Sequence, residues 1–300
     1  MTMMQIVLLC RKGFEAETAA EIQALANAAG CFGYCKTQSN QAWVSYVAED
    51  HQLKQLIEHV NFRELIFTRQ WFVSSDVVEL PSHDRVSTIL ENMGSIPLCG
   101  EVEIIHADTN GGKELSRLCK SLTGPLAASL RKNKKLSAKR NNKIPRLILM
   151  FLDGQQVLMG YHFTNNASKF PDGIMHLKSP KDAPSRSTLK LEEAWHWFIP
   201  KTEWDERLAP GMRAVDLGAA PGGWTWQLVK RNMMVSSVDN GPMKGDLMET
   251  GQVEHFLEDG FKFSPSKKVN WMVCDMAESP IKVAERMAHW IVNDWCNECV

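Results

Sequence analysis

The sequence predicts a mixed α/β protein with a nucleotide-binding domain in its second half. Strand-like and helix-like segments alternate along all 300 residues, of which 44% are hydrophobic. Residues 212–226 read as a strand, a glycine-rich turn and the start of a helix, which is the opening unit of a doubly wound sheet. A chain of this length suggests about two domains, or three small ones.

The first 75 residues predict a small α/β sandwich. Apolar runs of strand length alternate with apolar residues at helical spacing, at 5–10, 15–29, 42–47, 52–60 and 65–73. Arg69 lies close in sequence to Trp71 and Phe72. A cation next to aromatic rings fits contact with RNA, but a strand with one buried face explains the pattern equally well.

A second set of elements follows. We predict helices at 82–93, 113–121 and 126–133 and strands at 101–107, 147–151 and 156–161. Gly124-Pro125 separates the second and third helices, because proline interrupts helical hydrogen bonding. Asp153-Gly154 marks the turn of a hairpin between the last two strands.

A basic segment at 131–146 precedes this hairpin. Half of its residues are Lys or Arg and none is acidic; the basic ones are Arg131, Lys132, Lys134, Lys135, Lys139, Arg140, Lys143 and Arg146. The segment is either a solvated flexible loop or a site that binds nucleic-acid phosphates without choosing bases, and we favour the phosphate site. Residues 1–150 carry 18 basic and 15 acidic side chains, whereas residues 151–300 carry 16 and 20.

The segment 166–184 is predicted to link the two halves, because it contains Pro171-Asp172-Gly173, Pro180 and Pro184. A helix follows, with Ser187 as its N-cap and Lys190 in its first turn. A lysine near the positive end of a helix is mildly unfavourable, which suggests a functional role.

The glycine-rich turn indicates the ligand of the second half. Its spacing, Gly218-x-x-x-Gly222-Gly223, differs from the G-x-G-x-x-G of dinucleotide sites and lacks the Gly-Lys-Ser/Thr of a P-loop. A ligand with an adenosine but no phosphate fits both absences, and S-adenosylmethionine (SAM) is the obvious one. The other interpretation is a sharp turn that binds nothing.

Three carboxylates follow the next three predicted strands. Asp239, Asp259 and Asp275 come after strands predicted at 234–238, 252–257 and 270–274. The carboxyl ends of parallel strands share one sheet edge, where ligands bind. Asp239 can accept bonds from both ribose hydroxyls, Asp259 can lie beside the adenine amino group, and Asp275 can face the cationic end of the ligand. The alternative is a set of solvated strand-end aspartates.

The sequence gives no sign of metal binding, export or membrane insertion. A final amphipathic helix is predicted at 281–295. The C-x-x-C pair of Cys296 and Cys299 that follows has no second Cys or His pair at zinc spacing, so we interpret it as a coincidence at a helix end rather than a zinc site. The N-terminus does not resemble a secretory signal, and no apolar run approaches the ~18 residues of a membrane helix. We expect free thiols, a cytoplasmic location, no metal and a monomer.

Specific motifs carry a family resemblance. Val215-Asp-Leu-Gly-Ala-Ala-Pro-Gly-Gly-Trp224, Ser185-Arg-Ser-Thr-Leu-Lys190 and Cys274-Asp-Met276 resemble the FtsJ/RrmJ class of SAM-dependent RNA ribose 2′-O-methyltransferases. Segments along the whole chain, among them Phe67–Val73 and Val238–Met243, resemble the bacterial RlmM family. That family methylates a cytidine ribose in 23S rRNA of the large ribosomal subunit.

The resemblance implies domains and site residues. The domains are a ferredoxin-like domain at 1–75, a THUMP RNA-binding domain at 76–165, the linker at 166–184 and a Rossmann-like methyltransferase domain at 185–300. The implied SAM contacts are Ser187, Ala220, Pro221, Gly222, Gly223, Asp239, Asp259 and Asp275. Lys190 and Asp275 match the first two members of the family's catalytic Lys-Asp-Lys-Glu set. The implied partner is 23S rRNA or a large-subunit precursor.

The sequence departs from the family after Asp275. The family's second lysine, the proposed base for the 2′-hydroxyl, and its glutamate lie in further strands that this sequence does not contain. We therefore expect an incomplete methyltransferase domain that keeps most SAM contacts, lacks the base, and leaves the strand ending at Asp275 as an exposed edge. The alternatives are a SAM-dependent methyltransferase of an RNA base or a protein, and a non-catalytic protein that binds RNA and SAM.

Overall fold

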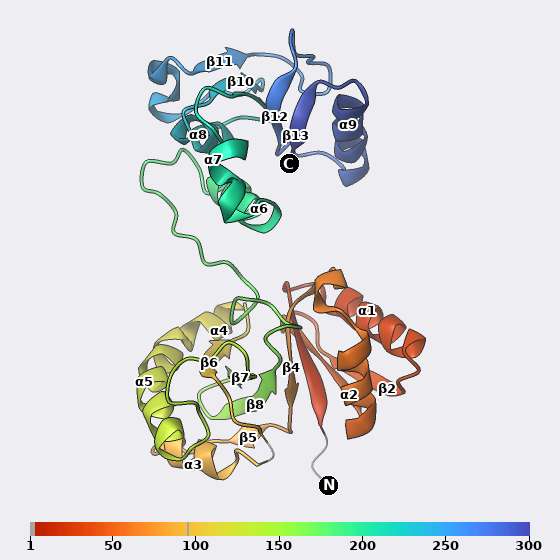
Figure 1. Cartoon of the computed structure of the whole chain (residues 1–300), viewed down its shortest axis with the longest axis vertical. Helices are drawn as coiled ribbons and strands as arrows, with labels where there is room; N and C mark the ends of the chain where they lie inside the picture. Colours follow the sequence, from red (N-terminus) through yellow and green to blue (C-terminus); the bar gives the residue numbers. More distant parts are fainter. Residues whose placement is uncertain (1–3, 95) are drawn as a thin grey trace. The chain divides into compact units, whose positions relative to one another are not determined.

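The computed structural model describes residues 4–94 and 96–300 (Figure 1). The chain forms two compact units that meet in the sequence between Ile174 and Met175, and each is built around its own β-sheet. This boundary lies inside the segment 166–184. None of the described helices is long and apolar enough to cross a membrane.

The first half of unit 1 is a ferredoxin-like β-α-β-β-α-β fold. Its elements are β1 (Gln5–Cys10), α1 (Glu15–Ala28), β2 (Gly33–Thr37), β3 (Trp43–Ala48), α2 (Asp50–His59), the 3₁₀ helix η1 (Phe62–Glu64) and β4 (Thr68–Ser74). The strands are antiparallel in the order β2-β3-β1-β4, and the helices bury Ile22, Leu53 and Leu56 with Ile6 and Leu8 of β1. Strand β2 is not among the predicted elements, because its mostly exposed residues contain no apolar run.

The second half of unit 1 adds helices and strands on the other side of β4. These are β5 (Val78–Glu79), α3 (Arg85–Glu91), β6 (Glu101–His106), α4 (Asn110–Glu114), α5 (Ser116–Lys132), β7 (Arg146–Phe151) and β8 (Gln156–His162). The predicted hairpin of β7 and β8 is confirmed, and Asp153 Oδ1 accepts bonds of 2.7 Å from the backbone N–H groups of Gln155 and Gln156 at its turn.

A single sheet runs through both halves of unit 1. β4 pairs with β8, with Val73 opposite Tyr161 and Ser74 opposite Gly160, so the strand order is β2-β3-β1-β4-β8-β7-β6. Glycine at position 160 allows this close approach, because a Cβ atom there would overlap the backbone carbonyl of Val73.

Helix α5 corrects the prediction of two helices separated by Gly124-Pro125. It is one helix with Pro125 inside it. Proline removes a backbone donor from the helix, but Leu126 and Leu130 just beyond it are fully buried in the core formed with β6 and β7. Burial of large apolar side chains, at ~1.5–3 kcal/mol each, keeps the helix continuous across the proline.

Unit 2 contains a parallel, Rossmann-like sheet in the order β11-β10-β9-β12-β13 (Figure 1). Its elements are α6 (Thr188–Phe198), η2 (Lys201–Glu203), α7 (Trp204–Arg207), β9 (Arg213–Leu217), α8 (Gly223–Lys230), β10 (Met234–Val238), η3 (Gly245–Thr250), β11 (Val253–Phe256), β12 (Val269–Cys274), α9 (Pro280–Val292) and β13 (Cys296–Cys299). Trp195 of α6 and Leu228 of α8 are buried on one face, and Trp290 of α9 is buried on the other.

Strand β13 corrects the expected edge of this sheet. The last helix is predicted to reach residue 295 and to leave β12 as an edge, whereas α9 ends at Val292 and β13 pairs with β12. The Cys274 N–H donates to the Val300 carbonyl at 2.9 Å, and the Val300 N–H donates to the Met272 carbonyl at 3.0 Å. Cys296 and Cys299 therefore lie on a strand rather than at a helix end, and both are free thiols.

Candidate active site

The glycine-rich turn brings β9, α6 and the end of β12 close together. Gly218 (φ +80°) and Gly222 (φ +110°) adopt the left-handed conformation that favours glycine. A Cβ atom at Gly218 would lie 2.9 Å from the backbone nitrogen of Met276, and one at Gly223 would lie 2.5 Å from Ser185 Oγ. A side chain at Gly218 or Gly223 would therefore force its neighbours to shift.

The start of α6 is fastened to the start of α8. Thr188 Oγ1 donates to the Gly223 carbonyl at 2.9 Å, and Trp224 Nε1 donates to the Ser187 carbonyl at 3.0 Å. Ser187 stands at the predicted N-cap position, but its side chain makes no capping bond within the described residues and instead shares a bond of 2.6 Å with Ser185 Oγ. The Ser187 hydroxyl lies against Gly223, where a Cβ atom would overlap it.

Asp216 is a buried acid whose role is not identified from the sequence alone. Its side chain is fully buried in β9, and Oδ2 accepts a bond of 2.7 Å from Thr225 Oγ1, which also bonds Ser237 Oγ at 2.8 Å. Oδ1 has no hydrogen-bond partner among the described residues. Burial raises the pKa of Asp216 to about 7, and the charges of Asp275 and Asp239 act in the same direction. An acid in an otherwise apolar strand is the signal that could have revealed it.

Asp239 follows β10 and fixes the turn. Its Oδ2 accepts a bond of 3.0 Å from the Ala220 N–H, and its Oδ1 accepts a bond of 2.7 Å from the Gly241 N–H. Each carboxylate oxygen can accept a further bond, so the side chain can hold the loop and still receive ligand hydroxyls.

Asp275 follows β12 and pairs with Lys190 from the first turn of α6. Lys190 Nζ lies 2.8 Å from Asp275 Oδ1 and 3.1 Å from Oδ2. The lysine side chain is 62% exposed and that of Asp275 is 29% exposed, so the pair faces solvent while its carboxylate is anchored in the sheet edge. The unfavourable lysine in the first turn of α6 thus has a specific acidic partner.

Asp259 lies in an irregular loop after β11 and is exposed. Its Oδ1 accepts a bond of 2.9 Å from the Phe261 N–H. The neighbouring Gly260 packs against Met276 and Leu217, since a Cβ atom there would lie 2.7 Å from Met276 Sδ and 3.6 Å from Leu217 Cβ. The loop thus returns to the ends of β9 and β12.

The predicted site residues of unit 2 therefore gather at the carboxyl edge of the sheet. The set is Ser187, Lys190, Ala220, Pro221, Gly222, Gly223, Asp239, Asp259 and Asp275. Three of these residues are aspartates against one lysine, and the turn 220–223, in which Gly222 and Gly223 are buried, lies beside them. This combination suits a cationic ligand that carries hydroxyl groups.

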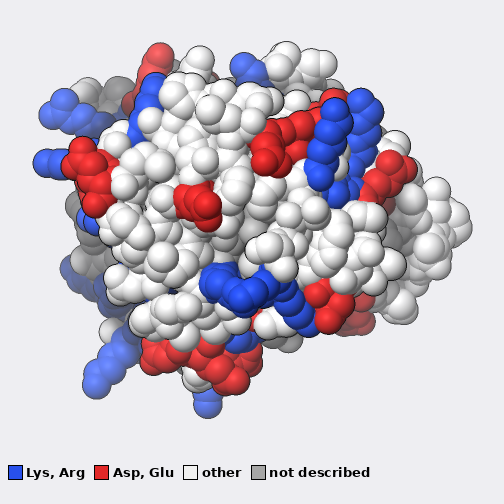
Figure 2. All heavy atoms as spheres, turned by 90° about the horizontal axis from the view of Figure 1, so that it is seen from above, with Lys and Arg blue, Asp and Glu red and all other residues white. Residues whose placement is uncertain are grey.

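The basic segment lies in unit 1, at the end of α5 and in the loop before β7. Arg131, Lys132, Lys134, Lys139, Arg140 and Lys143 are exposed, and Lys135 is half-buried. Arg140 also pairs with Glu101, at 3.0 Å. The face of the molecule in Figure 2 carries basic and acidic side chains interspersed, in keeping with the formal net charge of −1.

Arg146 corrects the prediction for this segment. Its side chain is buried, and Nη1 donates a bond of 2.8 Å to Glu103 Oε1. Removing either partner of such a pair leaves a buried charge without compensation. Arg146 is therefore committed to the packing of β6 against β7 and is not free to bind a phosphate.

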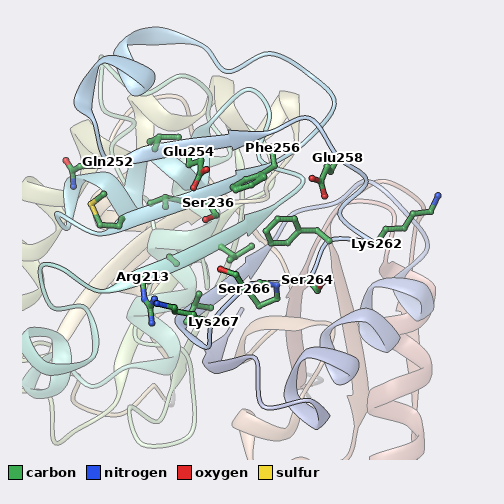
Figure 3. Close-up of a pocket in the computed structure, with 18 of the residues that line it drawn as sticks. Arg213, Ser236, Gln252, Glu254, Phe256, Glu258, Lys262, Ser264, Ser266 and Lys267 are labelled. Carbon is green, nitrogen blue, oxygen red and sulfur yellow. The ribbon is translucent and has the colours of Figure 1, made fainter.

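A hollow of about 530 Å³ lies on another part of unit 2 (Figure 3). Side chains of β9, β10, β11 and the loop at 262–267 line it, including Arg213, Ser236, Glu254 and Lys267. It contains none of the predicted site residues. Among the described residues, no group of three or more His, Cys, Asp or Glu side chains could hold a metal ion.

Three family models match the chain. They are described as the RlmM ferredoxin-like domain over residues 3–72, ribosomal RNA large subunit methyltransferase M, N-terminal, over residues 84–163, and FtsJ-like methyltransferase over residues 183–293.

Curated proteins of high identity cover nearly the whole chain. Ribosomal RNA large subunit methyltransferase M of Aliivibrio salmonicida is 48% identical over 304 residues, which cover 99% of this chain and 84% of the relative. The protein of the same name from Escherichia fergusonii is 51% identical, covering 99% of this chain and 82% of the relative. Among solved structures, TrmN from Thermus thermophilus is 12% identical with a TM-score of 0.37, covering 97% of this chain and 84% of that chain.

Proposed function

Because the chain belongs to the ribosomal RNA large subunit methyltransferase M family, we propose that it transfers a methyl group from SAM to the ribose 2′-oxygen of a cytidine in 23S rRNA. The observation that carries the proposal is the Lys190–Asp275 pair beside the glycine-rich turn, at the sheet edge where parallel α/β proteins bind ligands. The substrate would be 23S rRNA or a precursor of the large subunit, and the work of the enzyme would therefore be cytoplasmic.

The sheet edge has the chemistry that SAM requires. Asp239 holds the turn with one lone pair on each oxygen and keeps others for the two ribose hydroxyls. Asp259 would accept a bond from the adenine amino group. Asp275 and the other acids would stabilise the positive sulfonium, which supplies the methyl group when SAM is bound. Ser187 and the turn 220–223 would contact the remainder of the ligand through hydroxyl and backbone groups.

The Lys190–Asp275 pair would act on the ribose hydroxyl. In the transfer, the 2′-oxygen forms a bond to the methyl carbon, the carbon–sulfur bond breaks and leaves its electron pair on sulfur, and the hydroxyl proton passes to a solvent water molecule. Lys190, held by two contacts to Asp275, can orient the hydroxyl and add a positive field that favours the developing alkoxide. Positioning the 2′-oxygen in line with the methyl carbon supplies much of the acceleration.

The exposed part of the basic segment, residues 131–143, would bind rRNA phosphates. Such contacts supply affinity without base choice. We assign the choice of nucleotide to unit 1 as a whole, in which the proposed domains at 1–75 and 76–165 share a sheet.

The proposal is tested by methylation of 23S rRNA from cells that lack this protein. The rRNA is incubated with the chain and SAM, digested to nucleosides and analysed by mass spectrometry. The proposal predicts 2′-O-methylcytidine as the product, and its formation would show that the family's second lysine, which this sequence lacks, is not essential as the base. Lys190→Met and Asp275→Asn should abolish this product. Lys268→Met is the matched control. Lys268 is an exposed lysine directly before β12, and it pairs with Asp294.

Two outcomes would replace the proposal by another function. A methyl group found on a base or on protein would indicate a methyltransferase of different specificity. Binding of both SAM and RNA without any transfer would indicate a non-catalytic binding protein.

A further inference from the structure

Arg286 is a buried cation without an acidic partner. It lies in α9, is 8% exposed, and is paired with no carboxylate among the described residues. Its guanidinium carbon lies 5.7 Å from the ring centroid of Trp290 and 5.8 Å from that of Trp295. Burial lowers the pKa of Arg286, while Cys274 and Asp259 act in the opposite direction. Burying a charge is expensive unless it is compensated by hydrogen bonds, so the contacts of this side chain show what it is used for.

Both hydrogen bonds of the guanidinium go to one loop. Nε donates to the Gly260 carbonyl at 3.1 Å, and Nη2 donates to the Phe263 carbonyl. The loop at 257–268 contains no helix or strand among its residues, all of which are described. Its buried carbonyl groups therefore need donors from elsewhere, and the fork of a single arginine supplies two in a fixed geometry.

The residue that this loop presents at the sheet edge is Asp259. Gly260, directly after it, is clamped on one side by Arg286 and on the other by Met276. We propose that Arg286 is a positioning residue that holds Asp259 where its carboxylate recognises the adenine amino group of SAM. The inference rests on the proposed function, since it assumes SAM at this edge. Arg286 does not contact the ligand in this proposal and acts on it only by holding Asp259 in place.

The test compares two ligands that differ only at that amino group. S-adenosylhomocysteine carries the amino group, and its purine-riboside analogue carries a hydrogen atom in that place while ring nitrogen N1 stays an acceptor. Calorimetry on the full chain should show that Arg286→Met weakens binding of the adenosyl compound by on the order of tenfold, as for loss of a hydrogen bond to a charged group. Binding of the analogue without the amino group should stay within about twofold. The affinity for S-adenosylhomocysteine divided by the affinity for the analogue without the amino group should therefore fall.

Further variants separate positioning from general stability. Asp259→Ala should lower the same ratio, and the double variant should lower it no further, because both changes remove one interaction. Lys282→Met is the matched control on the same helix, since Lys282 is exposed and pairs only with Glu278 among the described residues. If Arg286→Met does not fold, Arg286→Lys supports the same comparison, because a lysine cannot reproduce the two-carbonyl fork.

The outcomes distinguish this inference from the proposed function. An unchanged ratio in a folded Arg286 variant, or an equal loss of affinity for both ligands, would overturn the positioning role and leave the proposed function intact. Failure of the wild-type chain to bind S-adenosylhomocysteine would overturn both.

Discussion

The buried carboxyl group of Asp216 should make the stability of unit 2 fall as the pH rises. In the folded chain the group keeps its proton up to a pKa of about 7, whereas in the unfolded chain it loses the proton near its ordinary value of 3.8. Between these values the folded state binds the extra proton. Stability is therefore highest below pH 3.8 with respect to this group and is lost progressively as the pH rises through 7.

The size of the effect follows from the two pKa values. Their difference, at about 1.4 kcal/mol per pKa unit, amounts to about 4 kcal/mol above pH 7, of which about 2.5 kcal/mol is lost between pH 5 and pH 8. Asp216→Asn removes the titration and keeps the shape of the side chain. The difference in unfolding free energy between wild type and variant should therefore shift by about 2.5 kcal/mol in favour of the variant over this interval.

Urea unfolding followed by tryptophan fluorescence measures this difference. Eight of the ten tryptophans lie in unit 2, so the fluorescence signal reports mainly on the unfolding of the unit that contains Asp216. Asp205→Asn, which changes an exposed acid of α7, controls for the loss of a surface charge. Parallel pH profiles for wild type and Asp216→Asn would refute the reasoning, whatever the stability of the variant at a single pH.

Three further predictions concern the ligand, the stability of unit 2 and the RNA. Asp239→Ala should weaken SAM binding by roughly 1–3 kcal/mol through loss of charge-assisted bonds, and unchanged affinity in calorimetry would reject its ribose role. Gly223→Ala should destabilise unit 2 by about 1–3 kcal/mol in urea unfolding, because its Cβ atom would overlap Ser185 and Ser187; Gly124→Ala, where a Cβ atom meets nothing within 4 Å, should be harmless. Replacing Lys132, Lys134 and Lys139 by Gln should reduce the slope of log affinity for RNA against log salt by about 0.7–0.9 for each phosphate that is no longer neutralised, whereas the same change at Lys12, Lys36 and Lys54 should not.

The parts of unit 2 that the sequence predicts are those whose conformation is determined by residues close together in the sequence. The glycine turn follows from backbone conformations that other residues rarely adopt, and the three strand-end aspartates follow from the shared edge of a parallel sheet. From the residues alone, Lys190 is noticed only as a misfit in the first turn of a helix, while the family resemblance names both Lys190 and Asp275. The two residues are 85 positions apart in the sequence, and their direct contact is seen only in the folded chain.

The features that are not predicted from the sequence depend on distant residues. α5 continues through Pro125 because Leu126 and Leu130 are buried against strands on either side of it in the sequence. β13 is a polar tetrapeptide whose strand conformation comes from pairing with β12. Arg146 looks like its basic neighbours, and only Glu103 on the adjacent strand shows that it belongs to the interior. Local composition carries none of this information.

The pairing of β4 with β8 has a consequence for the synthesis of this chain. Residues 5–74 leave the ribosome well before residues 156–162, so the ferredoxin-like half can assemble while one side of β4 still lacks its partner. An unpaired strand edge is a template for association with other chains, and growing chains fold from the N-terminus onward. Nascent chains are therefore most prone to aggregate during this interval, which ends when the β7–β8 hairpin emerges and covers the edge.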